Sequence, residues 1–283
     1  TTAWLALSQA LLESIPSPAA VSGRLQAPSP VPHIRRDIPM NATTQRIALV
    51  TGATRGIGLE TVRQLATAGV HVLLAGRDRA KAVEAPLPLQ GQGLRVEAIA
   101  PDAPSPDSPA AAVAEVGARH GRLDILVNNA GIMIDAPGVA PSQQSLQVWR
   151  DTFDTNVFAL VATTQAFLPL LRAAPAARIV NVSSVLGSVT LHSQPGSPIY
   201  DFKVPAYNVS KSAVNAWTAQ LAWELRDSAI KVNAIHPGYV KTDMSPEGDM
   251  DVVEGARSSV EMALLDADGP QGSFTHLGQV LPW

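Results

Sequence analysis

The chain contains no cysteine in its 283 residues. This absence excludes disulfide bonds, thiolate nucleophiles and cysteine-based metal sites together, and it favours a reducing compartment, the cytoplasm. The six histidines show no paired spacing of the HExxH type, so we also expect no metal site. The composition therefore points away from thiol and metal chemistry.

An excess of charge of one sign is also absent. The sequence has 21 Lys and Arg against 24 Asp and Glu, a net charge of −3, and no block of like charges. A nucleic acid or an anionic membrane is therefore not an expected partner, whereas small neutral or anionic ligands remain compatible with the sequence. With 46% hydrophobic residues, the simplest interpretation is a single catalytic domain over residues 45–283.

Residues 1–44 differ from the rest because prolines interrupt them at Pro16, Pro18, Pro28, Pro30, Pro32 and Pro39. We predict a poorly ordered N-terminal extension there. The apolar run over residues 4–15 is too short to span a bilayer and lacks the basic segment of a secretory signal. Two alternatives stay open: a transit peptide, favoured by Arg24, Arg35 and Arg36, and a natural start at Met40.

From Gln45 onward, short β-branched runs alternate with segments of helical spacing. Strands are predicted over 47–50, 70–74, 96–99, 125–127, 179–182 and 232–235, and helices over 57–68, 110–120, 146–171 and 206–226. Parallel strands need crossover connections, so this alternation predicts a Rossmann-type, doubly wound α/β fold of about seven strands with helices on both faces. Pro86 and Pro88 predict that the helix after the second strand is short or broken.

A glycine-rich turn, T-G-A-T-R-G-I-G at residues 51–58, follows the first predicted strand directly. Gly52 allows a tight turn, while Gly56 and Gly58 let the backbone approach a pyrophosphate. The N-terminus of the following helix offers unpaired N–H donors to phosphate oxygens. A glycine triplet alone is weak evidence, but its place after the first strand of an α/β series predicts a dinucleotide site.

The residue at the end of the second predicted strand bears on the choice between NAD(H) and NADP(H). In NAD-type sites a carboxylate about 20 residues after the glycines binds the ribose 2′-hydroxyl. Here Arg77 holds that place, and with Arg55 it could pair with a 2′-phosphate, which favours NADP(H). The neighbouring Asp78 keeps NAD(H) open, and both arginines could instead be ordinary solvated loop residues.

Tyr207 and Lys211 are four residues apart at the start of the last predicted helix, which places them on one face. A free tyrosine has a pKa near 10, so acid–base work at neutral pH needs a lower value. A nearby ammonium group, helped by the positive ring of an oxidised nicotinamide, favours the phenolate. Such a pair is common by chance, but together with the glycine turn it predicts a proton-transfer site.

These motifs, in this order, resemble the short-chain dehydrogenase/reductase family over residues 45–283. The resemblance rests on the glycine turn, Asn128-Asn-Ala-Gly131, Asn156, Ser183-Ser184, Tyr207-x-x-x-Lys211, and Pro237-Gly238 followed by Thr242. Residues 179–211 and the ending Gly269-Pro-Gln-Gly272 are most similar to carbonyl-reductase-like members.

The resemblance implies a catalytic role for each matching residue. Tyr207 would be the general acid in carbonyl reduction and the base in the reverse direction. Lys211 would bind the nicotinamide ribose and lower the pKa of the phenol. Ser184, rather than Ser183, would orient the substrate oxygen. Asn156 would hold a water in a proton relay, with a side chain satisfied in a helix–helix contact as the alternative.

The resemblance also implies a set of cofactor-binding residues. They are Gly52, Thr54, Arg55, Gly56, Ile57, Gly58, Arg77, Asp102, Asn129, Ala130, Gly131, Tyr207, Lys211, Pro237, Gly238, Val240 and Thr242. Asp102 resembles an acidic residue that contacts adenine. Asn128 would line the groove or fix neighbouring strands, and His236 would be a structural neighbour.

One segment departs from the compact members of the family. Ser184 and Tyr207 lie 23 positions apart, and the extra chain includes residues 191–204. Its Ile199, Tyr200 and Phe202 predict a wall of the substrate pocket, with a surface excursion as the alternative. In family members with insertions here, lower association states are favoured, so a monomer or a small homo-oligomer is expected.

The expected function is an NADP(H)-dependent carbonyl reductase or alcohol dehydrogenase that acts on a small molecule. The alternative within the enzyme class is an NAD-dependent dehydrogenase of sterols or sugars. Outside it, the alternatives are a nucleotide-sensing regulator without turnover and a scaffold protein. The retained Tyr207 and Lys211 argue against both.

Overall fold

In the residues that the computed structural model describes, 45–99 and 108–283, eight strands form one sheet in the order β3-β2-β1-β4-β5-β6-β7-β8. The strands are β1 (Ile47–Thr51), β2 (His71–Ala75), β3 (Val96–Ile99), β4 (Ile125–Asn128), β5 (Arg178–Val182), β6 (Lys231–Ile235), β7 (Phe274–His276) and β8 (Gln279–Val280). All neighbouring strands are parallel except β8, which pairs antiparallel with β7. The predicted extension over residues 1–44 lies outside the described residues.

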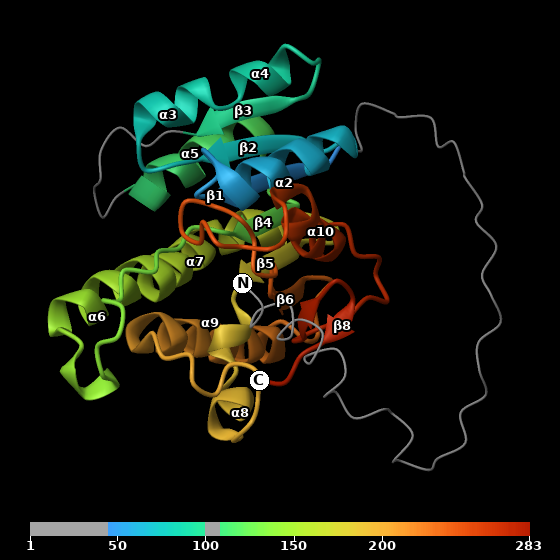
Figure 1. Cartoon of the computed structure of the whole chain (residues 1–283). Coiled ribbons are helices and arrows are strands. Elements are labelled where there is room, and N and C mark those ends of the chain that lie inside the picture. The colour runs from blue at the N-terminus through green and yellow to red at the C-terminus, as the bar shows by residue number, and fades with distance from the viewer. Residues whose placement is uncertain (1–44, 100–107) are drawn as a thin grey trace. The chain divides into compact units, whose positions relative to one another are not determined.

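Helices connect most of the parallel strands, as crossover connections require (Figure 1). The α-helices are α2 (Gly56–Thr67), α3 (Arg79–Glu84), α4 (Leu87–Gln90), α5 (Ser108–His120), α6 (Leu146–Phe153), α7 (Ala159–Arg172), α8 (Val189–Ser193), α9 (Pro205–Glu224) and α10 (Val252–Ala263). Two 3₁₀ turns, η2 (Pro141–Gln143) and η4 (Val185–Gly187), and the π turn η3 (Asp154–Phe158) are the other helical elements of residues 45–99 and 108–283. No helix in the described part of the chain is long and apolar enough to cross a membrane.

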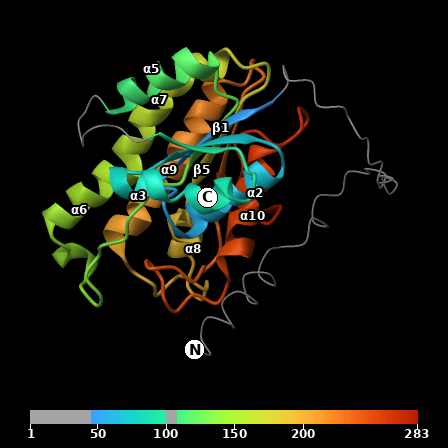
Figure 2. The same ribbon diagram turned by 90° about the horizontal axis from the view of Figure 1, so that it is seen from above.

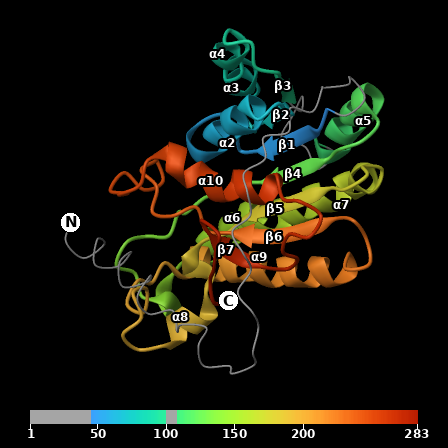
Figure 3. The same ribbon diagram turned by 90° about the vertical axis from the view of Figure 1, so that its right-hand side faces the viewer.

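The sheet is covered on both faces because alternate side chains of its buried strands point in opposite directions. Val50 and Val127 pack with residues of α2 and α10 in one apolar cluster. Leu49 and Leu126 pack with residues of α5, α7 and α9 in the other. Figure 3 shows α2 and α10 on one side of the strands and α7 and α9 on the other, and Figure 2 shows α5 beside α7. The predicted doubly wound architecture is confirmed.

All six predicted strands are present, with ends that differ by one residue at most. The additional strands β7 and β8 are too short to show an alternating pattern. Helix α10 was not predicted, and small residues make up most of its buried face: Gly255, Ala256, Ser258, Ser259 and Ala263. The helix after β2 is broken as predicted, since α3 and α4 are separated by Ala85 and Pro86.

The predicted helix over 146–171 is interrupted at the position of Asn156. Helix α6 passes into the π turn η3 before α7 continues to Arg172. Single π turns inside α-helices are frequent at functional sites. Nothing in the apolar spacing reveals this turn, because the pattern continues across it.

The order of the strands in the sheet indicates where a ligand is expected to bind. The chain runs outward from β1 to β2 and β3 and then returns to β4 on the other side of β1, so the order reverses between β1 and β4. Open α/β sheets bind ligands outside the carboxyl ends of their strands at such a reversal. The glycine turn after β1 and the Asn-Asn-Ala-Gly segment after β4 both lie at this edge.

Candidate active site

The glycine turn packs directly on the segment that follows β4. Asn129 Nδ2 donates to the carbonyl oxygens of Thr51 at 2.9 Å and Gly52 at 3.1 Å. A Cβ atom on Gly58 would come within 2.4 Å of that Nδ2, so only glycine fits there. Thr51 Oγ1 accepts the N–H groups of Asn129 and Ala130 at 3.1 and 3.2 Å. Asn129 and Ala130 thus lie against the glycine turn, as a shared cofactor groove requires.

The first turn of α2 fits the phosphates of a dinucleotide. The helix begins at Gly56, its N-cap residue Arg55 makes no side-chain capping hydrogen bond, and its first turn carries no acidic residue. The first N–H groups of a helix have no intrahelical partner, and the helix dipole favours an anion beside them. Gly52 and Gly56 adopt φ values of 61° and 56°, which shape this cradle.

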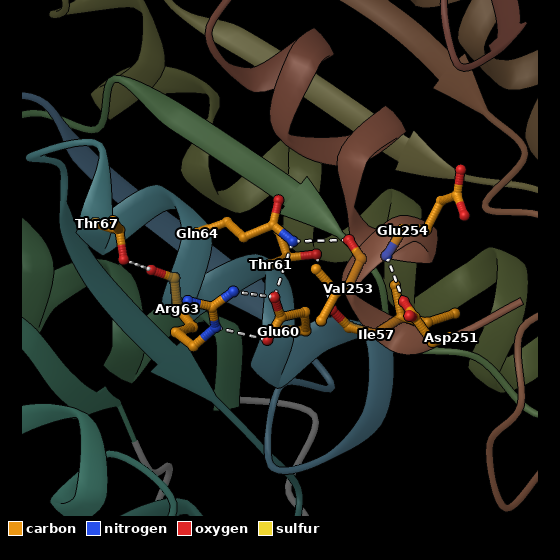
Figure 4. Close-up of polar contacts among 9 residues, drawn as sticks. All are labelled: Ile57, Glu60, Thr61, Arg63, Gln64, Thr67, Asp251, Val253 and Glu254. Carbon is orange, nitrogen blue, oxygen red and sulfur yellow. Dashed lines mark hydrogen bonds and ion pairs between the residues drawn. The ribbon is translucent and has the colours of Figure 1, made fainter.

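Helix α2 is fixed against α10, which makes the cradle rigid. Gln64 Nε2 donates to the carbonyl oxygen of Val253 at 2.8 Å and to Glu60 Oε1 at 2.8 Å. Arg63 forms a two-point contact with the same Glu60 carboxylate. Figure 4 shows these contacts, together with the Asp251 cap on the start of α10. The helix that would hold the phosphates is therefore tied to the chain that follows β6.

The segment after β6, which contains Pro237, Gly238, Val240 and Thr242, reaches back to the glycine turn. A Cβ on Gly56 would lie 3.6 Å from the Thr242 methyl group. Next to it, Arg55 Nη1 pairs with Asp243 Oδ2 at 2.6 Å. Val240 is buried against Gly255 of α10. His276 Nδ1 bonds to the carbonyl oxygen of His236 at 2.9 Å, and the two rings are 5.0 Å apart, which suits a structural role for His236.

The two residues that bear on cofactor choice lie in different environments. Arg77 is exposed and forms no ion pair with any described residue. Asp78 is the N-cap of α3, where Oδ1 accepts the N–H of Lys81 at 3.2 Å. Its carboxylate is therefore directed to a helix end. Asp102, predicted to contact adenine, lies outside the described residues.

The catalytic candidates meet at the carboxyl end of β5. Ser184 follows that strand, its hydroxyl lies close enough to Tyr207 to lower the pKa of the phenol, and its Oγ accepts the N–H of Leu186 at 3.2 Å. Lys211 Nζ lies 5.6 Å from the centre of the Tyr207 ring and donates to the carbonyl oxygen of Val182 at 2.8 Å. Ser183 points the other way, because its hydroxyl donates to the Lys211 carbonyl oxygen at 3.3 Å.

Burial controls the protonation of this pair. It raises the pKa of Tyr207 to about 12, and the hydrogen bond with Ser184 opposes the rise. Burial also lowers the pKa of Lys211 to about 8. Burial of the phenol therefore dominates its pKa in the polypeptide alone, and the lowering of that pKa by Lys211 stays a prediction. At neutral pH the phenol is protonated and poised to donate.

Asn156 ties the π turn to two neighbouring segments. Its Oδ1 accepts the N–H of Ile132 at 2.8 Å, and its Nδ2 donates to the Ile132 carbonyl oxygen at 2.9 Å and to Ser210 Oγ at 3.0 Å. A Cβ on Gly131 would lie 3.4 Å from both Asn156 Oδ1 and Lys211 Nζ. Asn156 and Lys211 therefore both border Gly131, and the Asn156 amide also fixes the backbone after β4. Ser210 had no signal in the sequence.

Asn128 is a structural residue. Its Nδ2 donates to Thr164 Oγ1 and Asn181 Oδ1, both at 2.9 Å, and its side chain is buried. It therefore links β4 to β5 and α7, the second of the two roles considered above. In the described ranges, no group of three or more His, Asp or Glu side chains could hold a metal ion.

The extra chain before α9 is folded rather than loose. Its first part forms α8, and Ser197 Oγ donates to the Leu191 carbonyl oxygen at 2.5 Å. Ile199 is fully buried and belongs to the packing of the segment, so it cannot form a pocket wall. Tyr200 is partly buried and Phe202 is 38% exposed, which leaves these two as wall candidates.

Comparison with known proteins gives consistent results. The family model "short chain dehydrogenase" matches residues 46–251. Short-chain dehydrogenase/reductase 1 of Saponaria officinalis is 33% identical, over 84% of this chain and 96% of its own. (+)-Neomenthol dehydrogenase of Arabidopsis thaliana is 32% identical, over 85% and 99%. The crystal structure of a single-substitution variant of actinorhodin polyketide ketoreductase with NADPH has a TM-score of 0.72 at 26% identity, over 84% and 97%.

The comparisons agree with the fold and with the glycine turn at the N-terminus of α2. This chain therefore belongs to the short-chain dehydrogenase family of oxidoreductases.

Proposed function

We propose that the chain is an NADP(H)-dependent reductase of an aldehyde or ketone that also works as an alcohol dehydrogenase. The observation that carries the proposal is the meeting of Tyr207, Ser184 and Lys211 at the carboxyl end of β5, beside Gly131. A carbonyl oxygen within reach of both hydroxyl groups would be polarised and then protonated at one place.

Each residue has a distinct task in this proposal. The bound cofactor supplies the hydride in reduction and accepts it in oxidation. Tyr207 donates its phenolic proton to the developing alkoxide, and Ser184 holds that oxygen in line. Lys211 holds a positive charge beside the phenolate that remains, which offsets part of the cost of burying it. Asn156, next to Lys211, orients the water that returns the proton.

The surroundings of Arg77 support NADP(H) over NAD(H). Gly76 approaches the glycine turn so closely that a Cβ on it would lie 2.4 Å from Thr54 Cγ2, which brings Arg77 beside the adenosine end of the groove. The Asp78 carboxylate, which could select a ribose hydroxyl, caps α3 instead. An exposed guanidinium that pairs with no acidic side chain among the described residues suits a 2′-phosphate. The similar ketoreductase was solved with NADPH.

The substrate class follows from the same site and from the relatives. A relative that covers most of this chain is named a neomenthol dehydrogenase, and a similar structure a polyketide ketoreductase. Both names describe interconversion of a secondary alcohol and a ketone. We propose the same reaction type here, on a small molecule. A non-catalytic nucleotide sensor is the weaker candidate, since it gives no reason for a buried Tyr207 and Lys211.

The test is a panel of aldehydes, ketones and quinones offered with NADPH and, separately, with NADH. Loss of absorbance of the reduced cofactor measures turnover. Turnover of a carbonyl compound with NADPH in preference to NADH is expected. Binding of NADPH without turnover of any compound would favour the sensor, and a preference for NADH would favour the NAD-dependent dehydrogenase.

The predicted cytoplasmic location and the predicted monomer or homo-oligomer belong to the same proposal. The folded segment before α9 supports a low association state, because it adds chain beside the helix that carries Tyr207. Light scattering measures the association state, and cell fractionation measures the location. A tetramer in solution would remove the idea that this segment limits assembly.

A further inference from the structure

The helix that carries Tyr207 begins without a cap of its own. Its N-cap residue is Val204, whose side chain cannot accept a hydrogen bond, and its first residue is Pro205, which has no N–H. The next two residues, Ala206 and Tyr207, occupy the positions whose N–H groups a local Ser, Thr, Asp or Asn normally satisfies. The helix therefore depends on an acceptor from elsewhere at the residue where the chemistry takes place.

Asp135, in the loop after β4, supplies that acceptor. Its Oδ1 accepts the N–H of Ala206 at 2.8 Å, and its Oδ2 accepts the N–H of Tyr207 at 3.0 Å. The two carboxylate oxygens thus accept the N–H groups of two adjacent residues. Asp135 itself lies more than 70 positions earlier in the chain than these residues. Hydrogen bonds to an ionised acceptor are stronger than neutral ones, and a negative charge at a helix N-terminus is favoured.

The same loop is held by Asn156. Both backbone groups of Ile132 bond to the Asn156 amide, and Asn156 Nδ2 also donates to Ser210 Oγ. Ser210 Oγ in turn donates to the carbonyl oxygen of Tyr207 at 2.7 Å. A closed circuit therefore runs from the Tyr207 carbonyl through Ser210, Asn156, Ile132 and Asp135 back to the Tyr207 N–H. The two backbone groups of the proton donor are held from two sides.

We propose that Asp135 is a positioning residue for Tyr207, an inference that rests on the proposed function. It fixes the position of the Tyr207 side chain in the groove by linking the first turn of α9 to the loop that contains Gly131. The phenol is thereby kept beside Ser184, which follows β5. Asp135 acts through the backbone of Tyr207 and need not touch the substrate.

The test compares Asp135→Ala and Asp135→Asn with Asp124→Asn. Asp124 is a matched control, because its buried carboxylate also accepts a backbone N–H, that of Ile47 at 2.8 Å, but at the amino end of β1. Three quantities are measured: the single-turnover rate of NADPH oxidation with the best carbonyl of the panel, the dissociation constant of NADPH, and the melting temperature.

Asp135→Ala should lower the single-turnover rate about 10- to 100-fold, as misplacement of a catalytic group by about 1 Å does. The dissociation constant of NADPH should stay within about twofold, since the phosphate cradle is untouched. Asp135→Asn should be intermediate, because its amide oxygen keeps one acceptor. Asp124→Asn should lower only the melting temperature.

Hydrogen exchange of the peptide that spans residues 204–210 gives a readout independent of turnover. Exchange of the first turn of α9 should accelerate in both Asp135 variants and not in Asp124→Asn. If Asp135→Ala does not fold, Asp135→Asn carries the test. Full turnover in a folded Asp135 variant would overturn the proposal, even where Tyr207→Phe is inactive. An inactive wild type would instead count against the proposed function, and unchanged exchange in the variants would overturn the positioning role by itself.

Discussion

The cofactor side and the catalytic side of the site differ in how exposed their polar side chains are. On the cofactor side, the charged groups lie at the surface: the Arg55 and Asp243 side chains are 73% and 71% exposed, and Arg77 is exposed. On the catalytic side, Tyr207 and Lys211 are buried, at 9% and 4% exposure, and Lys211 Nζ donates to the carbonyl oxygen of Val182.

Because of this difference in exposure, substitutions should be tolerated to different extents on the two sides of the site. Exposed charges interact weakly because water and salt screen them, so the cofactor side depends chiefly on backbone N–H groups that no side-chain change removes. Buried polar groups have no water to replace a lost partner, so each change there has a large cost. Substitutions on the catalytic side should therefore have the largest effects, and those among the exposed charges the smallest.

Tyr207→Phe should produce the largest effect. It removes the transferable proton and keeps the ring, so turnover should fall about 10²- to 10⁴-fold while NADPH affinity stays nearly intact. Steady-state kinetics and NADPH fluorescence measure the two quantities. Tyr200→Phe removes a hydroxyl from the partly buried tyrosine of the extra segment and should change turnover far less. Equal turnover in wild type and Tyr207→Phe would sink the mechanism.

Lys211→Met should abolish turnover yet stabilise the fold at pH 7. Burial lowers the pKa of Lys211 from its ordinary 10.5 to about 8, so below pH 8 the folded protein carries the full cost of a buried ammonium. Between about pH 8 and 10.5 the unfolded chain binds more protons than the folded one, so wild-type stability rises with pH in that window.

The Met variant lacks this titration. It should be more stable at pH 7 by roughly 3 kcal/mol, and it should lack the rise in stability between about pH 8 and 10.5. Denaturant unfolding at several pH values measures this. A variant less stable than wild type at pH 7 would mean that the hydrogen bond from Lys211 to Val182 outweighs the burial cost.

Arg77→Ala tests the cofactor side. Loss of a guanidinium contact to the 2′-phosphate should weaken NADPH binding by about tens-fold and leave NADH binding almost unchanged. Titration of both cofactors measures the ratio, with the exposed neighbour Arg79→Ala as the matched control. If the wild type already prefers NADH, the assignment of Arg77 to the 2′-phosphate is wrong. Asp78 would then be the candidate for binding the ribose hydroxyl.

Asp243→Asn should produce the smallest effect. The ion pair with Arg55 is exposed, so it contributes only about 0–1 kcal/mol to stability. Releasing Arg55 should raise NADPH affinity slightly at low salt and not at high salt. Titration at two ionic strengths separates these cases. A large loss of NADPH affinity would mean that Asp243 helps to shape the cofactor groove. It would then not compete with the cofactor phosphate for Arg55.

Much of the fold could be predicted because the buried strands of a parallel sheet are nearly continuous apolar runs. The strands around residues 47–51 and 125–128 show such runs and were identified within one residue. Strands β7 and β8 could not be predicted because they have only three and two residues, and most of the buried residues of helix α10 are small.

The site was predicted to a different extent on its two sides. The glycine turn can be recognised locally, since its geometry needs glycine whatever packs around it. The role of Asp78 could not be foreseen, because an aspartate after a strand can bind a ribose or cap a helix. The pKa of Tyr207 was expected to fall, and burial, which no spacing rule reports, raises it.

Most strands and helices, the glycine turn and the spacing of Tyr207 and Lys211 could be predicted, because each depends on residues close together in the chain. The side chains that hold these groups in place are known only from the folded structure. The π turn at Asn156, the contact of Ser210 with the Tyr207 carbonyl and the cap that Asp135 places on α9 join segments far apart in sequence. Such contacts form because buried N–H and C=O groups must find partners wherever the fold brings one within reach.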